Sequence, residues 1–383
     1  MRVVRIATIP FVVLHHLESQ IRAAVEAGHE VFIVTGPGQG DDQLASLGVA
    51  GVVLLEIPRE IAPLADLVAL FRLYRALGRL KPDLVHSITP KAGLIAAIAG
   101  WLCGVGVRIH TFTGQAWAER GGLVRSLSRL SDKVILKLNT RCYADSFSQR
   151  KFLVDERIAT PDSLQVLGAG SLAGVDLQRF DPVRLRGPAA DARAALGIPA
   201  GARVIVFLGR VTRDKGIGEL VSAFKRLRGA ALVLVGPQEP ARDPLPLETV
   251  EEMRRNPGIH AIGYQAAPER YLAMADVLCL PSYREGFGIV VIEAAALGVP
   301  CVGTQIVGLG DAVVDGETGL LVPPKDAEAL ARALATLLGD DVRRAAFGAA
   351  ARTRVLAEFD ASVLNRKLLQ EYAALLERAQ PRP

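Results

Sequence analysis

Strand-length apolar runs alternate with helix-length periodic segments along most of the chain, and this alternation constrains the fold more than any other feature. Two of the periodic segments are Leu17–Ala27 and Leu64–Leu80. The expected strands of the N-terminal half are Val3–Ile9, Val31–Thr35, Val52–Ile57, Leu84–Ser87 and Val107–Phe112. An alternation of this kind predicts an α/β fold, in which helices cover both faces of a parallel sheet.

The same alternation starts again after Phe180. Its expected strands are Val204–Leu208, Ala231–Val235, Gly258–Ile262, Val277–Leu280, Cys301–Gly303 and Leu320–Val322. The 383 residues also exceed what one hydrophobic core usually supports. We therefore predict two doubly wound domains, 1–178 and 179–360, and a C-terminal helical segment 361–383 that crosses back to the first domain. Ligands of such sheets bind at the carboxyl ends of the strands, so we expect the site in a cleft between the domains.

Composition narrows the classes of function. The net charge of +5 is small and dispersed, and no zinc-finger or RNA-binding signature accompanies it, so a nucleic-acid partner is not expected. Four cysteines without CxxC spacing predict a reduced, cytoplasmic chain. No secretory signal is evident at the N-terminus. The long uncharged stretch Ala92–Val107 has 16 residues and predicts a buried helix, because a membrane span needs about 20 apolar residues.

The stretch Glu285–Glu293 is the most informative motif for function. It follows an expected strand, contains Gly286 and Gly288, and runs into an apolar segment, so it predicts a strand, a glycine turn and the start of a helix. A helix N-terminus offers unpaired N–H groups that bind phosphate oxygens. Carboxylates beside it can accept hydrogen bonds from hydroxyls. The two properties together suggest a nucleotide sugar. Glu293 lies among apolar residues, where a charge needs a ligand or a structural partner.

A second motif, Gly209–Gly216, follows the expected strand Val204–Leu208. Arg210 can bind two phosphate oxygens with its guanidinium fork, and Lys215 can add a point charge. A solvated loop with ordinary basic residues is the alternative. We favour a diphosphate site, because this loop and Glu285–Glu293 both follow strand ends in the same predicted domain.

With these motifs the sequence resembles the retaining glycosyltransferases of family 4, whose GT-B fold has two Rossmann-like, doubly wound domains facing a central cleft. The resemblance covers essentially the whole chain. It is carried by the E-x7-E element at Glu285 and Glu293, the loop Gly209–Gly216, the turn Asp315–Gly319 before Leu320–Pro323, and the segment Gly174–Phe180.

The resemblance implies a donor site in the second domain. Glu293 would accept hydrogen bonds from the ribose, and Glu285 would contact hydroxyls of the transferred sugar. Arg210 and Lys215 would neutralise the leaving diphosphate, which makes Arg210, Lys215 and Glu285 the expected catalytic residues. The full expected donor set is Gly209, Arg210, Lys215, Glu285, Gly286, Phe287, Gly288, Ile289 and Glu293.

No metal and no cofactor are expected besides the nucleotide-sugar substrate, which we expect to be UDP-linked. In the family that the chain resembles, cations and a helix dipole take the place of a metal. The sequence contains no Asp-x-Asp motif, and its six histidines lack metal-ligand spacing.

The acceptor side of the first domain is predicted less fully. Many relatives have a histidine directly before the glycine that follows the last expected strand, whereas this chain has Thr113 before Gly114 and places His110 three residues earlier. We interpret His110 as a packed core residue. The expected cleft or acceptor contacts are Thr113, Gly114, Gln115, Lys91 at the start of a helix, and His15 and His16 in an expected loop Pro10–His16.

A predicted basic helix suggests a membrane surface as a further partner. Arg125, Arg129, Lys133 and Lys137 recur every four residues beside apolar side chains, and Arg72, Arg75 and Arg79 mark another helix. A basic amphipathic helix can lie on an anionic bilayer, although a solvated helix face over the core is an equal alternative. We therefore hypothesise peripheral attachment to the inner face of the cell membrane.

The interpretation that follows is a bacterial retaining hexosyltransferase. It would move a hexose or N-acetylhexosamine to a polyprenyl-diphosphate-linked or other saccharide acceptor in cell-surface glycan synthesis. A nucleotide-sugar 2-epimerase of similar architecture and a non-catalytic nucleotide-binding subunit are the alternatives. The oligomeric state stays open.

Overall fold

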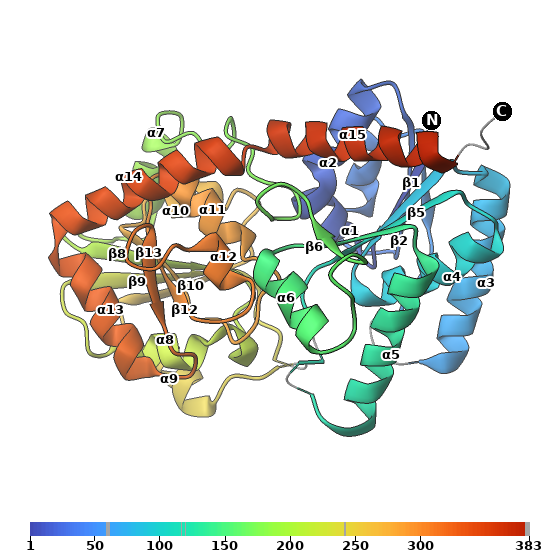
Figure 1. The fold of residues 1–383 in the computed structure, drawn as a ribbon. Helices are drawn as coiled ribbons and strands as arrows, with labels where there is room; N and C mark the ends of the chain where they lie inside the picture. The colour runs from blue at the N-terminus through green and yellow to red at the C-terminus, as the bar shows by residue number, and fades with distance from the viewer. Residues whose placement is uncertain (59–61, 116, 119, 241–242, 380–383) are drawn as a thin grey trace. The chain divides into compact units, whose positions relative to one another are not determined.

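The computed structural model describes residues 1–58, 62–115, 117–118, 120–240 and 243–379, and residues 380–383 of the predicted C-terminal segment lie outside them. The chain divides into two compact units. The first comprises residues 1–173 and 361–383, and the second comprises residues 174–360. Figure 1 labels most of the helices and strands of both.

The described part of the first unit forms a seven-stranded parallel sheet with the strand order β3-β2-β1-β4-β5-β6-β7. This contains the order 3-2-1-4-5-6 of a Rossmann fold. Its strands are β1 (Arg2–Ile6), β2 (Glu30–Thr35), β3 (Gly51–Leu54), β4 (Leu84–Ile88), β5 (Val107–Phe112), β6 (Arg141–Ala144) and β7 (Gln165–Val166). Its α-helices are α1 (Pro10–Val12), α2 (Glu18–Glu26), α3 (Pro63–Leu80), α4 (Pro90–Leu102), α5 (Gly122–Leu138), α6 (Phe147–Asp155) and α15 (Ala361–Ala379).

The two faces of strand β1 show how the first unit is packed. Successive side chains of a strand point to opposite faces. Val4 and Ile6 belong to a buried cluster with residues of α3 and α4, including Leu73. Between them, Arg5 faces the other way and donates a 2.7 Å hydrogen bond to the hydroxyl of Tyr372 in α15. The C-terminal helix therefore docks on the first unit through a buried polar contact as well as apolar side chains.

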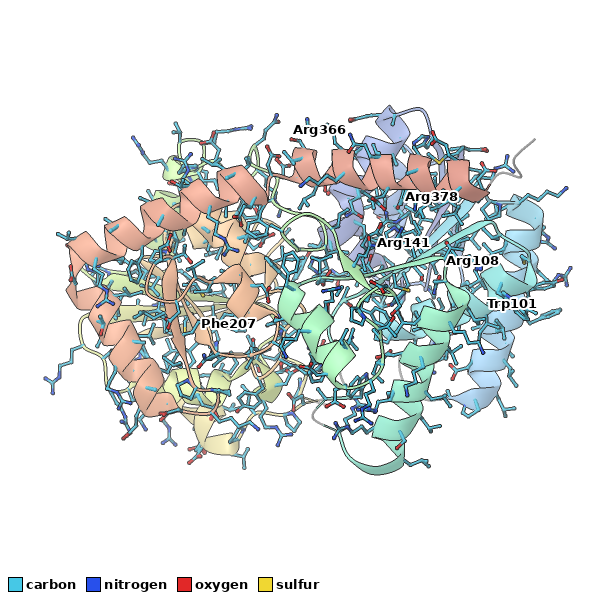
Figure 2. All side chains as sticks on the ribbon, viewed as in Figure 1. Trp101, Arg108, Arg141, Phe207, Arg366 and Arg378 are labelled. Atoms are coloured by element: carbon cyan, nitrogen blue, oxygen red, sulfur yellow. The ribbon has the colours of Figure 1, made fainter. Side chains whose placement is uncertain are left out.

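The second unit forms a six-stranded parallel sheet within its described residues, with the order β10-β9-β8-β11-β12-β13. Its strands are β8 (Arg203–Leu208), β9 (Ala230–Val235), β10 (Ile259–Gly263), β11 (Val277–Leu280), β12 (Cys301–Thr304) and β13 (Gly319–Val322). Its α-helices are α7 (Arg186–Ala195), α8 (Ile217–Phe224), α9 (Leu247–Arg255), α10 (Glu269–Ala273), α11 (Ile289–Ala296), α12 (Leu309–Ala312), α13 (Ala327–Gly339) and α14 (Asp341–Glu358). Phe207 of the central strand β8 is fully buried within it (Figure 2).

The predicted α/β class with two doubly wound sheets is confirmed, but several local predictions were wrong. The expected loop Pro10–His16 is helical, because α1 begins at Pro10 and a π-helical turn covers Val13–Leu17. Pro10 occupies the first helical position, where its fixed φ and missing N–H favour a helix start. Strand β1 consequently ends at Ile6 rather than Ile9.

The sheet of the first unit also has two strands that were not predicted, β6 and β7. Strand β6 has four residues and begins with a charged side chain, and β7 has only two residues, so neither gives a periodic apolar pattern. The uncharged stretch from Ala92 forms most of α4, which is largely buried as predicted. Within the described residues, no helix combines the length and hydrophobicity needed to cross a bilayer.

Candidate functional site

Two loops meet at the carboxyl edge of the second sheet. Strands β8 and β11 are hydrogen-bonded neighbours, and each is followed by one of the two predicted motifs. Lys215 from the first loop donates a 2.6 Å hydrogen bond to Glu285 Oε1 of the second, and Ser282 Oγ donates to the same oxygen at 2.7 Å. Both charged side chains are mostly enclosed, being 16% and 15% exposed. The structure thus brings Lys215 and Glu285, 70 residues apart in sequence, into one cluster.

Close backbone packing holds these loops together. Gly216 ends the Lys215 loop with φ +70°, and a Cβ there would lie 2.1 Å from the carbonyl oxygen of Pro281. Gly308 approaches the second loop in the same way, with a hypothetical Cβ 2.5 Å from the carbonyl oxygen of Gly286. Real side chains cannot occupy such positions without moving the backbone. Glycine at these positions therefore allows the contacts that fix the Lys215–Glu285 pair.

Arg210 lies in the same loop as Lys215 and is more exposed. Its Nη1 is 3.0 Å from Glu239 Oε2, and its Nη2 is 3.5 Å from Asp214 Oδ2. Burial opposes ionisation of Asp214, but a hydrogen bond from Thr212 and the charge of Arg210 hold the pKa of Asp214 below its usual value. Two further cations near Asp214, Lys215 and Arg284, act in the same direction. The carboxylates of Glu239 and Asp214 therefore hold Arg210 in place in this loop.

Helix α11 begins at Ile289, directly after Gly288 in a left-handed conformation. The first N–H groups of any helix have no partner inside the helix. Phe287 is 2% exposed, and its ring packs 5.3 Å from that of Phe359, which anchors the turn in the core. The predicted strand, glycine turn and helix are therefore present, and the backbone N–H groups at Phe287 and Gly288 lie at a fixed helix start.

Glu293 occupies the middle of α11, among buried apolar neighbours. Burial raises its pKa to about 7, with a smaller rise from the nearby Glu269 and an opposing effect of Arg179. Arg179 donates to Glu269 Oε2 at 2.9 Å. Sequence reasoning did not assign Arg179 or Glu269 to the site, although Arg179 lies in the Gly174–Phe180 motif. Burial, more than these two neighbours, therefore gives Glu293 a pKa near neutral pH.

The predicted residues of the first unit have partners of their own. Lys91, at the start of α4, forms a partly buried ion pair with Asp66 of α3. His15 stacks on Phe11 with ring centroids 4.0 Å apart. Burial, assisted by the neighbouring His15, lowers the pKa of His16 to about 4. His16 is therefore neutral at physiological pH.

The segment after strand β5 contains three predicted contacts. Thr113 and Gly114 are partly exposed, and Gly114 has φ +101°. Gln115 is 8% exposed, and its Oε1 accepts a 3.1 Å hydrogen bond from Gln149 of α6. His110 lies in the core, where burial lowers its pKa to about 3 and its Nδ1 contacts Ser87 Oγ at 3.0 Å.

Asp145, directly after strand β6, is a buried acid that the sequence did not single out. It is 6% exposed, its Oδ1 has no hydrogen-bond partner among the described residues, and burial raises its pKa to about 8. An aspartate in an unfolded chain titrates near pH 3.9. Between those values the native state holds a proton that the unfolded state has released, so stability falls as pH rises.

We therefore expect Asp145→Asn to flatten the decline in melting temperature of the wild type between about pH 5 and about pH 9. The amide carries no charge, so the variant should be more stable than the wild type at the alkaline end. Thermal unfolding monitored by circular dichroism across the range would test this. Asp155→Asn, at a side chain that is 59% exposed, is the matched control and should leave the pH dependence unchanged. An unaltered decline in Asp145→Asn would contradict the assignment.

The basic stripe predicted on α5 is partly neutralised. Arg125 and Arg129 both form ion pairs with Glu156, and their guanidinium groups lie 5.8 Å and 5.2 Å from the ring centre of Trp117. Only the second half of the stripe, at Lys133 and Lys137, has no ion pair within the described residues. The structure therefore weakens the case for α5 as a membrane-binding helix. Among the described residues, no group of three or more His, Cys, Asp or Glu side chains could hold a metal ion.

Comparison with known proteins gives matches over both units. A family model described as "Glycosyl transferases group 1" matches residues 189–354, and one described as "Glycosyl transferase 4-like domain" matches residues 13–170. The D-inositol 3-phosphate glycosyltransferase of Corynebacterium diphtheriae is 36% identical over 382 residues, covering 93% of this chain and 83% of that protein. The capsular polysaccharide biosynthesis glycosyltransferase CapM of Staphylococcus aureus is 29% identical over 374 residues, covering 95% of each chain.

Solved structures show the same fold. The sucrose-phosphate synthase of Thermosynechococcus elongatus superposes with a TM-score of 0.81 at 24% identity, covering 99% of this chain and 100% of that one. HepE of Anabaena, solved in complex with UDP and glucose, has a TM-score of 0.81 at 18% identity. The match covers 98% of this chain and 100% of the HepE chain. At these identities the likeness supports the architecture of the two units.

Proposed function

The chain belongs to the group 1 glycosyltransferases and has the GT-B type of fold, and on that premise we propose that it transfers a hexose or N-acetylhexosamine from a nucleotide sugar with retention of configuration. The observation that carries this proposal is the cluster of Lys215 and Glu285 beside the start of α11, with Arg210 in the same loop as Lys215. It combines cations for a diphosphate with a carboxylate for sugar hydroxyls.

The donor in this proposal is a UDP-sugar bound to the second unit. HepE, which shares the fold, was solved with UDP and glucose and also with UDP-glucose, which supports this choice of nucleotide. Glu293 would accept hydrogen bonds from the ribose, and Glu285 from hydroxyls of the sugar. The N–H groups of Phe287 and Gly288 would meet the sugar or phosphate at the start of the helix.

The proposed mechanism follows from where charge develops. The bond between the sugar anomeric carbon and the phosphate oxygen breaks, and the electron pair leaves with the diphosphate. Arg210 and Lys215 stabilise that anion in fixed positions, which is usually the largest catalytic contribution. An ammonium has three N–H donors, so Lys215 can keep Glu285 and still donate to a phosphate oxygen. These cations and the helix start supply the positive charge, so the proposed transfer is independent of metal.

The acceptor hydroxyl then attacks from the face that the diphosphate leaves. Its proton passes to the departing phosphate oxygen, and the new glycosidic bond keeps the configuration of the donor. In this proposal Glu285 and Glu293 bind the donor and do not act as the acid and base of a hydrolase.

The proposed acceptor is a polyprenyl-diphosphate-linked or other saccharide in cell-surface glycan synthesis. The name of CapM, a capsular polysaccharide biosynthesis glycosyltransferase, supports this choice. D-Inositol 3-phosphate is a second candidate, because the Corynebacterium relative named for it has the higher identity, 36%. The relatives reported above give no support to a 2-epimerase. A cytoplasmic enzyme attached peripherally to the membrane fits the lipid-linked acceptor.

A panel of nucleotide sugars tests the proposal directly. We expect saturable binding and slow hydrolysis of a UDP-sugar, undiminished by a chelator, and weaker binding of donors with other bases. An acceptor screen should then contain polyprenyl-diphosphate sugars and inositol 3-phosphate, with the product's anomeric configuration read by NMR. An inverted product, or UDP binding without release from any donor and acceptor, would count against the proposal.

A further inference from the structure

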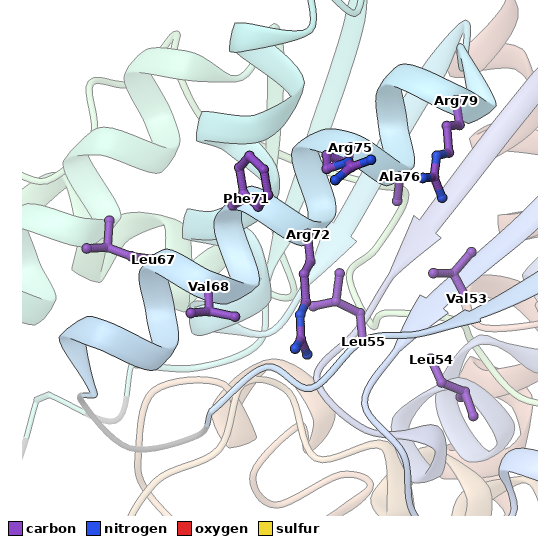
Figure 3. A pocket seen from close by; sticks show the side chains of 10 residues that line it. All are labelled: Val53, Leu54, Leu55, Leu67, Val68, Phe71, Arg72, Arg75, Ala76 and Arg79. Atoms are coloured by element: carbon purple, nitrogen blue, oxygen red, sulfur yellow. The ribbon is translucent and has the colours of Figure 1, made fainter.

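A groove of about 650 Å³ lies between helix α3 and the edge strand β3 of the first unit. Its walls combine apolar side chains with three arginines. Figure 3 shows Arg72 extending from α3 toward Leu55, and Arg79 lying near Val53. The groove belongs to the first unit alone, and none of the proposed donor-binding residues lines it.

The outer face of α3 is unusually apolar for a surface helix. The helix buries one row of side chains, Ala69, Leu73 and Leu77, against the sheet. On its other side, Leu67 and Phe71 line the groove while 62% and 59% exposed. A helix on the surface of a soluble protein normally carries polar residues there. A contiguous exposed apolar patch marks a binding surface.

The charges of this face have one sign. Arg72, Arg75 and Arg79 line the groove, and no carboxylate among the described residues forms an ion pair with any of them. The single acid of α3, Asp66, is bonded to Lys91. The guanidinium of Arg75 lies 5.8 Å from the ring centre of Phe71, so one of the cations sits directly beside apolar surface. Apolar surface with only positive charge is complementary to an anionic amphiphile.

Aromatic side chains continue the same surface onto the end of α4. The thiol of Cys103 is 3.4 Å from the carbonyl oxygen of Tyr74, which places the end of α4 beside the middle of α3. Tyr74, Trp101 and Leu102 are 43%, 55% and 52% exposed, and Figure 2 shows Trp101 at the outer edge of the first unit. Tyrosine and tryptophan favour the interface between membrane and water.

We propose that the α3–β3 groove and the adjoining end of α4 form the surface on which this protein binds an anionic phospholipid bilayer. The arginines contact headgroup phosphates, and Leu67, Phe71 and Trp101 enter the acyl boundary. A lipid occupant accounts both for the aromatic residues and for the three arginines, which have no ion-pair partner in the part of the chain that the structure describes. Of the two basic helices named in the membrane hypothesis, the inference favours α3 over α5, and it does not depend on which acceptor the enzyme uses.

Vesicle co-sedimentation of the full chain tests the proposal. The variant Arg72→Gln/Arg75→Gln should bind vesicles containing phosphatidylglycerol about 30-fold more weakly, given the usual contribution of each cation near an anionic surface. Phe71→Ser should also weaken binding. The matched control is Lys133→Gln/Lys137→Gln on α5, which removes two exposed cations elsewhere in the same unit and should bind like the wild type.

UDP-sugar hydrolysis, measured on the same preparations, keeps this inference separate from the proposed function. We expect hydrolysis and melting temperature to be unchanged in both double variants, because the altered side chains are exposed and outside the donor site. Wild-type binding that is absent, or equal on neutral phosphatidylcholine vesicles, would overturn the proposal. It would also be overturned if the α5 control lost vesicle binding while the groove variant kept it. The same holds if the groove variant lost self-association but bound vesicles like the wild type.

Discussion

Replacing Lys215 by alanine should lower turnover about 100- to 1000-fold, the usual loss when one fixed charge-stabilising donor is removed from an active site. The effect should appear in kcat, because the diphosphate carries its additional charge only as the bond to the sugar breaks. Lys215 is well placed for this role, since its ammonium is mostly enclosed and held at 2.6 Å by Glu285. Steady-state kinetics with a saturating UDP-sugar would measure the loss.

The same substitution also affects stability, and the two effects can be separated. Alanine would leave the Glu285 carboxylate with Ser282 as its only side-chain donor among the described residues, which costs up to about 3 kcal/mol for a largely buried charge. The double variant Lys215→Met/Glu285→Gln removes both charges, so it should recover most of the melting temperature and none of the turnover. Recovery of turnover together with stability would show that Lys215 acts only on the fold.

Arg213 provides a control within the same loop. Its side chain is 69% exposed and lies 3.4 Å from Asp243. Arg213→Ala removes one positive charge from the loop without touching the Lys215–Glu285 pair. We expect turnover within about threefold of the wild type, since exposed ion pairs contribute little. A loss equal to that of Lys215→Ala would mean that the net charge of the loop matters and the position of Lys215 does not.

Much of the fold was predictable because a buried parallel strand has a short apolar run of its own in the sequence. The central strand β11 is a continuous apolar run. Its bounds and those of β5 match the prediction residue for residue. The C-terminal segment was also predicted to be helical, and the buried residues of the helix Ala361–Ala379 recur at its 3.6-residue period. In contrast, the two-residue strand β7 exists only because β6 lies beside it, and no local pattern indicates such a strand.

The individual residues of the candidate site were predictable from the sequence, but the contacts between them were not. Glycines and charges at strand ends pointed to Lys215 and Glu285 separately. Their direct contact depends on β8 and β11 being neighbours, which is a property of the sheet order. The partner of Arg210, Glu239, is contributed by the loop after yet another strand. Long-range electrostatics of this kind need the topology before they can be inferred.

For the basic stripe on α5, the sequence predicted a feature that the folded unit only partly retains. Four cations at a spacing of four residues predicted a single basic surface. In the folded unit, Glu156 from the end of α6 neutralises Arg125 and Arg129. Helical periodicity identifies which side chains share a face, but the charge of that face also depends on the segments that pack beside it.

Glu293→Gln should weaken UDP-sugar binding about 10- to 100-fold above neutral pH, because hydrogen bonds from hydroxyls to a charged acceptor are stronger than those to an amide. Burial raises the pKa of Glu293 to about 7, so the fraction of carboxylate grows as pH rises through that value. Wild-type affinity should therefore increase between about pH 6 and about pH 8, and the glutamine variant should show no such increase. Calorimetric titration with UDP across this range would measure both slopes. An unchanged affinity in the variant would contradict the ribose assignment.

A second variant identifies the titrating group. Glu269 raises the pKa of Glu293, and Glu269 also holds Arg179 through an ion pair of 2.9 Å. Glu269→Gln removes the like charge and weakens the hold on Arg179, so both changes favour the ionised form of Glu293. The pH at which UDP affinity rises should then move to a lower value, while the affinity at high pH stays near that of the wild type. If Glu293 is the titrating group, removing the charge of Glu269 must shift the midpoint. A midpoint that stayed in place would therefore mean that another group titrates.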